Sequence, residues 1–130
     1  IFGTKIDRAN VADGSVIRAD SLERCVIGIR SIIEGGTSLK NVIMMGADYY
    51  ESQEEREYNV SRGVPPIGIG RNCKIENAII DKNARIGDNC VLSPKGKPDK
   101  WEAEGLYVRD GVLIVTKQAV IQSNTVVHGA

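Results

Sequence analysis

The stretch Ile69–Val91, which reads IGRNCKIENAIIDKNARIGDNCV, shows most clearly how this sequence is organised. Isoleucine opens each of four consecutive units, at Ile69, Ile75, Ile80 and Ile86, and the first three units are six, five and six residues long. The second-last residue of every unit is a small Cys or Ala. A period of six fits neither the 3.6-residue turn of a helix nor the alternation of a long strand. It fits a short strand followed by a corner.

The same period occurs on both sides of this stretch. Upstream, Ile27, Ile33, Leu39 and Met45 stand six residues apart, and downstream a unit that begins at Val115 resumes the pattern. Three such units would make one triangular coil of a parallel β-helix, with the aliphatic and the small residues pointing inward. Gly, Asp and Asn between them tolerate the left-handed backbone angles of a corner. A meander of ordinary short strands is the alternative, and about a dozen near-regular units argue against it.

Two breaks in the pattern predict insertions, at about residues 46–66 and 93–111. Glu51–Val60 is rich in helix formers and free of Gly and Pro, so the first insertion is expected to contain a short exposed helix. Ser93–Glu104 holds two prolines and a glycine among charged residues and is expected to be a surface loop. Leu106–Val108 and Val112–Val115 are expected to be strands on either side of a turn.

Composition excludes several classes of protein. The 130 residues contain 17 Lys and Arg against 17 Asp and Glu, and the resulting formal charge of zero argues against a nucleic-acid partner held by phosphate contacts. No apolar run approaches the ~20 residues that a membrane helix needs, so no membrane partner is expected. Three Cys fit a reducing compartment better than a disulfide scaffold. The length fits a single domain over residues 1–130.

The residues needed for several reactions of β-helix proteins are missing. Hexapeptide acyltransferases use a histidine base, and hexapeptide carbonic anhydrases use three histidine ligands for their metal. This sequence has one histidine, His128, two residues from its end. The three cysteines show no CxxC spacing, so the sequence predicts no metal site and no catalytic residue.

Two of the cysteines are expected to lie on top of one another. Cys73 and Cys90 each occupy the fifth position of a unit, and they are 17 residues apart, which is one coil of units of six, five and six residues. They are interpreted as small buried side chains, with a redox pair as the alternative.

Two lysines are the candidate site residues. Lys82 and Lys117 both occupy the third position of their units, on a corner that faces outward, and so they could lie on the same edge of the molecule. An ammonium group suits phosphate oxygens, so such a pair could bind a phosphorylated metabolite. The alternative is that both are solvated surface charges, with Asp81 as the partner of Lys82 in an exposed pair of little energetic weight.

Several longer strings resemble the C-terminal domain of glucose-1-phosphate adenylyltransferase (ADP-glucose pyrophosphorylase). They are, in order, MGADYYE from Met45, PIGIG from Pro66, AIIDKNARIGDN from Ala78, YVRDG from Tyr107 and VTK from Val115. The resemblance covers about residues 10–127. It implies an all-β, left-handed parallel β-helix of hexapeptide repeats that follows an N-terminal nucleotidyltransferase domain, which this chain lacks.

The resemblance also implies a function. The family makes ADP-glucose and pyrophosphate from ATP and glucose 1-phosphate, for glycogen or starch synthesis. Its Mg²⁺ and ATP bind the catalytic domain, so no cofactor is expected here, and this chain is not expected to turn over substrate alone. Its β-helix contacts the catalytic domain and the sister subunits of a homo- or hetero-tetramer. A soluble protein of a bacterial cytoplasm or a plastid is expected.

The family's β-helix carries part of an allosteric site as well. In the plant and cyanobacterial type, lysines of the IIDKNARIG string and of the last coils bind 3-phosphoglycerate or phosphate, and these positions match Lys82 and Lys117. The second insertion, with Trp101, departs from the plant pattern, which leaves the identity of the effector open. The alternative function is a purely structural assembly module whose lysines bind no effector.

Overall fold

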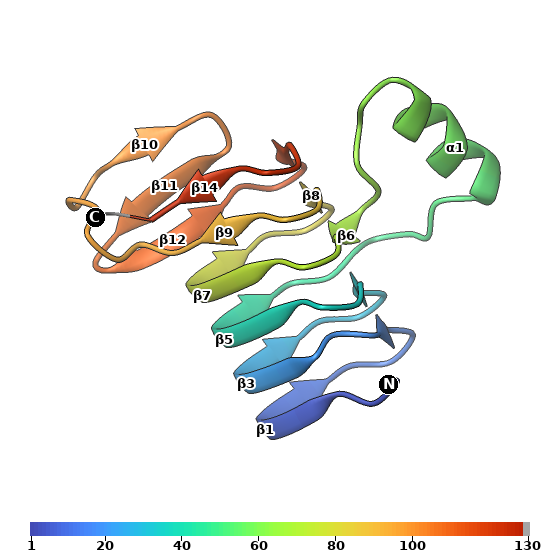
Figure 1. Ribbon diagram of the computed structural model, residues 1–130, viewed down its shortest axis with the longest axis horizontal. Helices are drawn as coiled ribbons and strands as arrows, with labels where there is room; N and C mark the ends of the chain where they lie inside the picture. The colour runs from blue at the N-terminus through green and yellow to red at the C-terminus, as the bar shows by residue number, and fades with distance from the viewer. Residues whose placement is uncertain (129–130) are drawn as a thin grey trace.

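A computed structural model describes residues 1–128, and it consists of short strands and one helix (Figure 1). Nine strands form the larger sheet: β1 (Lys5–Val11), β3 (Ser21–Ile27), β5 (Ser38–Met44), β7 (Lys74–Ile80), β9 (Val91–Leu92), β10 (Glu102–Ala103), β11 (Leu106–Arg109), β12 (Val112–Val115) and β14 (Val126–Val127). Five form the second sheet: β2 (Val16–Ile17), β4 (Ile32–Ile33), β6 (Gly68–Ile69), β8 (Arg85–Ile86) and β13 (Val120–Ile121).

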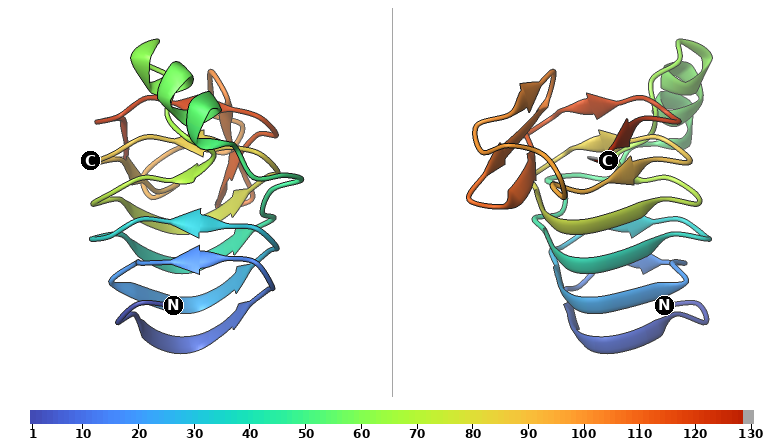
Figure 2. Two further views of the ribbon diagram at one scale, coloured as in Figure 1. Left: turned by 90° about the vertical axis from the view of Figure 1, so that its right-hand side faces the viewer. Right: turned by 60° about the vertical axis from the view of Figure 1, so that its left-hand side comes forward.

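The strands wind into stacked coils, as the repeat predicts (Figure 2). Pairing between neighbouring coils is parallel, and equivalent residues stand side by side at intervals of one coil. Leu22 pairs with Leu39, and Ile75 with Leu92, each 17 residues further along the chain. In the second sheet Ile69 pairs with Ile86 at the same interval. The expected parallel β-helix is confirmed.

The interior is a narrow aliphatic column with little aromatic content. Each coil contributes Ile, Leu or Val at its inward positions and a small residue at each corner, so the column is filled by stacked side chains of similar shape. The fully buried large side chains are Ile17, Leu22, Ile27, Ile33, Leu39, Val42, Ile69, Ile75, Ile80, Ile86, Leu92 and Leu113.

One predicted inward position is wrong. Met45 stands six residues after Leu39, but its side chain is 43% exposed, whereas that of Met44 is only 4% exposed. The unit that begins at Leu39 has five residues, and its turn comes already at the third residue, Asn41, with a positive φ of 53°. Arg24 and Asn77 turn the neighbouring coils at the same corner, with φ of 51° and 50°.

The first insertion contains α1 (Gln53–Ser61), so the predicted short helix is confirmed. The Ser52 hydroxyl accepts from the Glu55 amide, and the Glu55 carboxylate accepts from the Ser52 amide, which together form a capping box. None of the helix residues is buried. The helix therefore stands on the surface of the coils (Figure 2), and contacts elsewhere in the insertion must fix its position.

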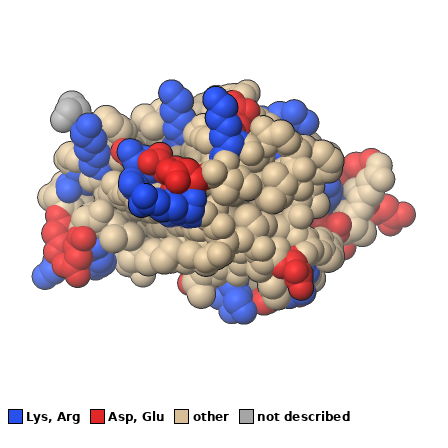
Figure 3. Space-filling model, turned by 90° about the horizontal axis from the view of Figure 1, so that it is seen from below, with Lys and Arg blue, Asp and Glu red and all other residues tan. Residues whose placement is uncertain are grey.

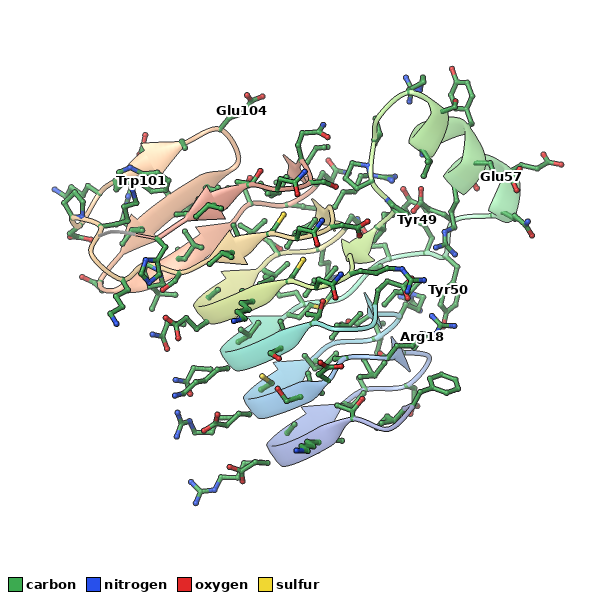
Figure 4. The ribbon with its side chains drawn as sticks, viewed as in Figure 1. Arg18, Tyr49, Tyr50, Glu57, Trp101 and Glu104 are labelled. Atoms are coloured by element: carbon green, nitrogen blue, oxygen red, sulfur yellow. The ribbon has the colours of Figure 1, made fainter. Side chains whose placement is uncertain are left out.

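The second insertion is a β-extension beside the last coils. β12 pairs in parallel with β7 and antiparallel with β11, and β11 pairs antiparallel with β10. The two strands expected around Asp110 and Gly111 are confirmed. The expected loop differs only at its end, where Glu102–Ala103 pairs with β11. Trp101, on this extension (Figure 4), is half-buried and packs against the core, and Lys97 lies over its ring.

The first coil is open on its outer side. Ile6 pairs with Leu22 in the inward register, yet its side chain is 45% exposed, since no coil within residues 1–128 covers it. Seen from this end, charges of both signs occur in small groups around a broad uncharged stretch (Figure 3). Within the described residues, no helix has the length and hydrophobicity needed to cross a membrane.

Candidate anion-binding corner

Lys82 and Lys117 lie on stacked corners of neighbouring coils. The amide of Gln118 donates to the carbonyl of Lys82 at 2.9 Å, and the amide of Asp81 donates to the carbonyl of Val115 at 3.0 Å. Both lysine side chains are exposed. Asn83 and Gln118, the residues that follow them, take a positive φ of 61°, and this turns each corner outward. We call this stack the lysine corner: residues 46–48, 81–83 and 116–118.

A third segment completes the lysine corner from the other side. The amide of Asn83 donates to the carbonyl of Gly46 at 3.1 Å, which places the start of the first insertion directly against residues 81–83. Gly46 has a φ of 91°, in the left-handed region where a side chain is strained. This backbone conformation leads the chain from β5 past the lysines and into the insertion.

Asp48 is the ion-pair partner of Lys82. Its carboxylate oxygen Oδ1 lies 3.3 Å from the Lys82 ammonium, while Oδ2 accepts from the Asn83 amide group at 3.0 Å. The backbone amide of Asp48 in turn donates to the Asn83 side-chain oxygen at 2.9 Å. Asn83 is therefore bonded twice to Asp48, and it is itself only 6% exposed.

These contacts keep Asp48 ionised. Hydrogen bonds from Asn83 and Lys82, and the positive charges of Lys82 and Lys117, hold the pKa of Asp48 below its usual value. Within residues 1–128, Lys117 has no carboxylate at ion-pair distance. The corner thus offers one paired and one unpaired ammonium group.

The expected partner of Lys82 is wrong. The Asp81 carboxylate accepts from the backbone amide of Lys82 at 2.7 Å and closes its own turn, and the Lys82 ammonium pairs with Asp48 instead. Sequence reasoning missed Asp48 and Asn83. One signal was available in the sequence. Asp48 lies near the start of the first insertion, shortly after β5, and β5 pairs with β7, the strand that leads into residues 81–83.

Arg85, another cation of the same repeat block, belongs to a different cluster. Its guanidinium pairs with Glu51 at 2.8 Å, and the side chains are only 16% and 4% exposed. Glu51 also accepts from the amides of Ile67 and Asn59, and Arg85 donates to the Pro65 carbonyl. This cluster fixes the insertion to the coils, and it leaves Arg85 unavailable to a ligand.

Polar groups of the first coils and two aromatic side chains lie next to the lysine corner on its N-terminal side. Arg30 donates to the Ala47 carbonyl at 2.8 Å, and the Tyr50 hydroxyl donates to the Gly14 carbonyl at 2.7 Å. Tyr49 and Tyr50, on the segment between β5 and α1, are exposed (Figure 4). Tyr49 follows Asp48 of the lysine corner directly in the sequence, whereas the side chain of Tyr50 reaches the first coil.

A hollow lies between α1 and the outer face of the five-stranded sheet. Its floor is lined by Gly68, Gly70 and Gly87, and Val64 and Pro66 form part of its wall. At its rim Glu34 pairs with Arg18 at 3.1 Å and lies 4.0 Å from Arg56, so one carboxylate faces two guanidinium groups there.

Cys73 and Cys90 are stacked as predicted. Both are fully buried, and the amide of Lys74 donates to the Cys90 carbonyl at 2.9 Å. The Cys73 thiol donates to the Cys90 sulfur, and this hydrogen bond together with burial raises the pKa of the Cys73 thiol. Within the described residues there is no group of three His, Cys, Asp or Glu side chains placed to hold a metal ion.

The fold and the corner define a class of protein: a parallel β-helix domain of hexapeptide repeats with paired lysines on one edge. The chain belongs to the family of the GLGC left-handed parallel β-helix domain, which matches residues 1–126. It is 44% identical, over 126 residues, to glucose-1-phosphate adenylyltransferase large subunit 1, chloroplastic/amyloplastic, from Zea mays. The match covers 95% of this chain and 24% of the relative's length. The resemblance noted in the sequence is confirmed.

Proposed function

We propose that this β-helix is the C-terminal regulatory and assembly domain of a glucose-1-phosphate adenylyltransferase. The maize relative supports this assignment, although the chain spans about a quarter of that protein's length. The complete enzyme would join ATP and glucose 1-phosphate, and its Mg²⁺ and nucleotide would bind a catalytic domain outside these residues. A plastid or a bacterial cytoplasm would be its location.

The regulatory part of the proposal rests on the stacking of Lys82 on Lys117. Two ammonium groups on adjacent coils, with a third segment beside them, can hold the oxygens of one phosphate group. Such a phosphate would belong to a phosphorylated sugar acid or would be inorganic phosphate. Binding would favour one arrangement of the catalytic domain against the β-helix, and a coupling of about 1–3 kcal/mol suffices for allosteric control.

The assembly part rests on the open first coil. Phe2 and Ile6 are large apolar side chains that are 62% and 45% exposed at this end. Among residues 1–128 no strand pairs with the outer edge of β1, and the backbone groups of such an edge can pair with a strand of another domain or chain. The catalytic domain and the sister subunits of a tetramer are the partners that fit the proposed enzyme.

The test of the regulatory role is charge reversal at each lysine in the complete enzyme. Lys82→Glu and Lys117→Glu should raise the concentration of phosphorylated activator needed for half-maximal rate at least about fivefold, with little change in unactivated turnover. Lys74→Glu is the matched control, because Lys74 is exposed on β7 outside the corner. Unchanged activation by both corner variants would reject the regulatory role and leave a purely structural module.

A further inference from the structure

The ion pair between Asp48 and Lys82 is built into the fold. One carboxylate oxygen faces Lys82 at 3.3 Å, and the other is held by Asn83, which also fixes the backbone of Asp48. Asn83 is buried and bonded to Gly46 through its own backbone. The carboxylate is therefore held beside the lysine by a rigid neighbour.

The position of Asp48 matters for any anion that approaches the corner. A phosphate placed between Lys82 and Lys117 would carry its negative charge close to the Asp48 carboxylate, which is ionised. Like charges at this range repel even in a solvated setting. To bind the phosphate, the Lys82 ammonium group must divide its donors between the phosphate and Asp48 or leave Asp48, whereas Lys117 has no ion pair within residues 1–128.

Asp81 does not form the ion pair with the Lys82 ammonium group. Its carboxylate is turned to the backbone amide of Lys82, at 2.7 Å, and it closes the local turn. Asp48 comes from a different coil, at the start of the first insertion, so it is the acidic group that ties the lysine corner to that insertion.

We propose that Asp48 is a built-in competitor for Lys82, which lowers the affinity of the lysine corner for a phosphate group. This inference rests on the proposed function. It adds a residue that sets the concentration of phosphate compound at which the site becomes occupied. Binding exchanges one partner of Lys82 for another. Asp48 therefore sets how much phosphate compound is needed before the corner is occupied.

The test is the isosteric variant Asp48→Asn. The amide side chain of this variant retains an oxygen that can accept from Asn83, so the corner should stay folded while its negative charge is lost. Titration of the 130-residue chain with inorganic phosphate at low ionic strength, followed by the NMR shifts of the amides of residues 81–83 and 116–118, gives the dissociation constant. We expect Asp48→Asn to lower this constant by about three- to tenfold.

Two further variants separate the possible results. Asp20→Asn removes the same charge at an exposed position of a different corner, and it should bind phosphate as the unchanged protein does. Lys82→Gln should weaken binding whether it is made alone or together with Asp48→Asn. Equal affinity of the Asp48→Asn and unchanged proteins, with loss of binding in Lys82→Gln, overturns the inference but keeps the proposed site. Phosphate binding that is unchanged in Lys82→Gln, or the absence of binding in every variant, overturns both the inference and the proposed site.

Discussion

Glu51 and Arg85 form a 2.8 Å ion pair that joins the first insertion to the second sheet. Glu51 precedes α1, Arg85 opens β8, and neither side chain is more than 16% exposed. The remaining oxygens and amides of the cluster are satisfied by Ile67, Asn59 and Pro65. Since none of the residues of α1 is buried, this cluster holds the helix in place.

Arg85→Ala is therefore expected to release the insertion. Removing one partner leaves the nearly buried Glu51 carboxylate without its counter-charge, which costs about 2–4 kcal/mol at a buried pair. Hydrogen exchange should accelerate in residues 53–66 and change little in β3 and β5. Arg71→Ala, an exposed arginine with no side-chain ion pair among the described residues, is the control and should exchange like the unchanged protein. Similar exchange in the two variants would contradict the role of the pair.

The same cluster predicts a dependence of stability on acid. Burial alone would raise the pKa of Glu51, but the Ile67 amide and the Arg85 guanidinium hold it below its ordinary value of 4.5. A carboxyl group whose pKa is depressed in the folded state stabilises that state above about pH 4.5, and loses this contribution as pH falls through the folded pKa. Denaturant unfolding of the unchanged protein and of Glu51→Gln should differ at pH 7, and the difference should shrink as pH falls below 4.5 and through the depressed pKa of Glu51. A difference that does not depend on pH over the whole acid range would exclude this linkage.

The repeat made the β-helix predictable from sequence, because each inward position is set by residues within the same unit. Ile27, Ile33 and Leu39 are buried as expected. A strict period of six predicts Met45 in place of Met44, because the unit that begins at Leu39 has only five residues. Comparison over a whole coil would have found it, since Met44 lies 17 residues after Ile27.

The contacts of the insertions could not be predicted in the same way. The repeat fixes the positions of Lys82 and Arg85 on their coil. It does not predict the path of the first insertion or the point at which the insertion rejoins the coils. The pairing of Asp48 with Lys82, and of Glu51 with Arg85, depends on that path. The stacking of Lys82 on Lys117 was foreseeable, because both occupy the same position of their units.

Gly28 is required by the spacing of the coils. Its amide donates to the Met44 carbonyl, and a Cβ at this position would collide with the backbone carbonyl of Met45 on the next coil. Gly28→Ala should lower the free energy of unfolding by about 1–3 kcal/mol, measured by denaturant titration. Gly35→Ala is the control, because a Cβ there meets nothing within 4 Å and its φ is not in the left-handed region. It should be neutral or slightly stabilising, and equal losses in both variants would refute the packing argument.

The cysteines should react only when the protein unfolds. Cys25, Cys73 and Cys90 are all buried, and burial raises the pKa of the Cys25 thiol. A thiol reagent needs an accessible thiolate, so labelling of the folded protein should follow the rate of unfolding. Stopped-flow labelling at several denaturant concentrations measures both rates. Rapid labelling of any cysteine under native conditions would show that a coil opens locally.

Asn41 combines a strained backbone with a side-chain ladder, and two substitutions separate these effects. Its φ is 53°, its side-chain oxygen accepts from Arg24 at 2.7 Å, and its amide group donates to Asn77 at 3.0 Å. Asn41→Ala loses the ladder and places an unsuitable side chain in the left-handed region, while Asn41→Gly loses the ladder without this strain but gives the unfolded chain more backbone freedom. Because the strain of about 1–2 kcal/mol exceeds this entropy difference of about 0.5–1 kcal/mol, the alanine variant should be about 0.5–1 kcal/mol less stable than the glycine variant in denaturant unfolding. An alanine variant that is more stable than the glycine variant would contradict the role of the left-handed backbone at this corner.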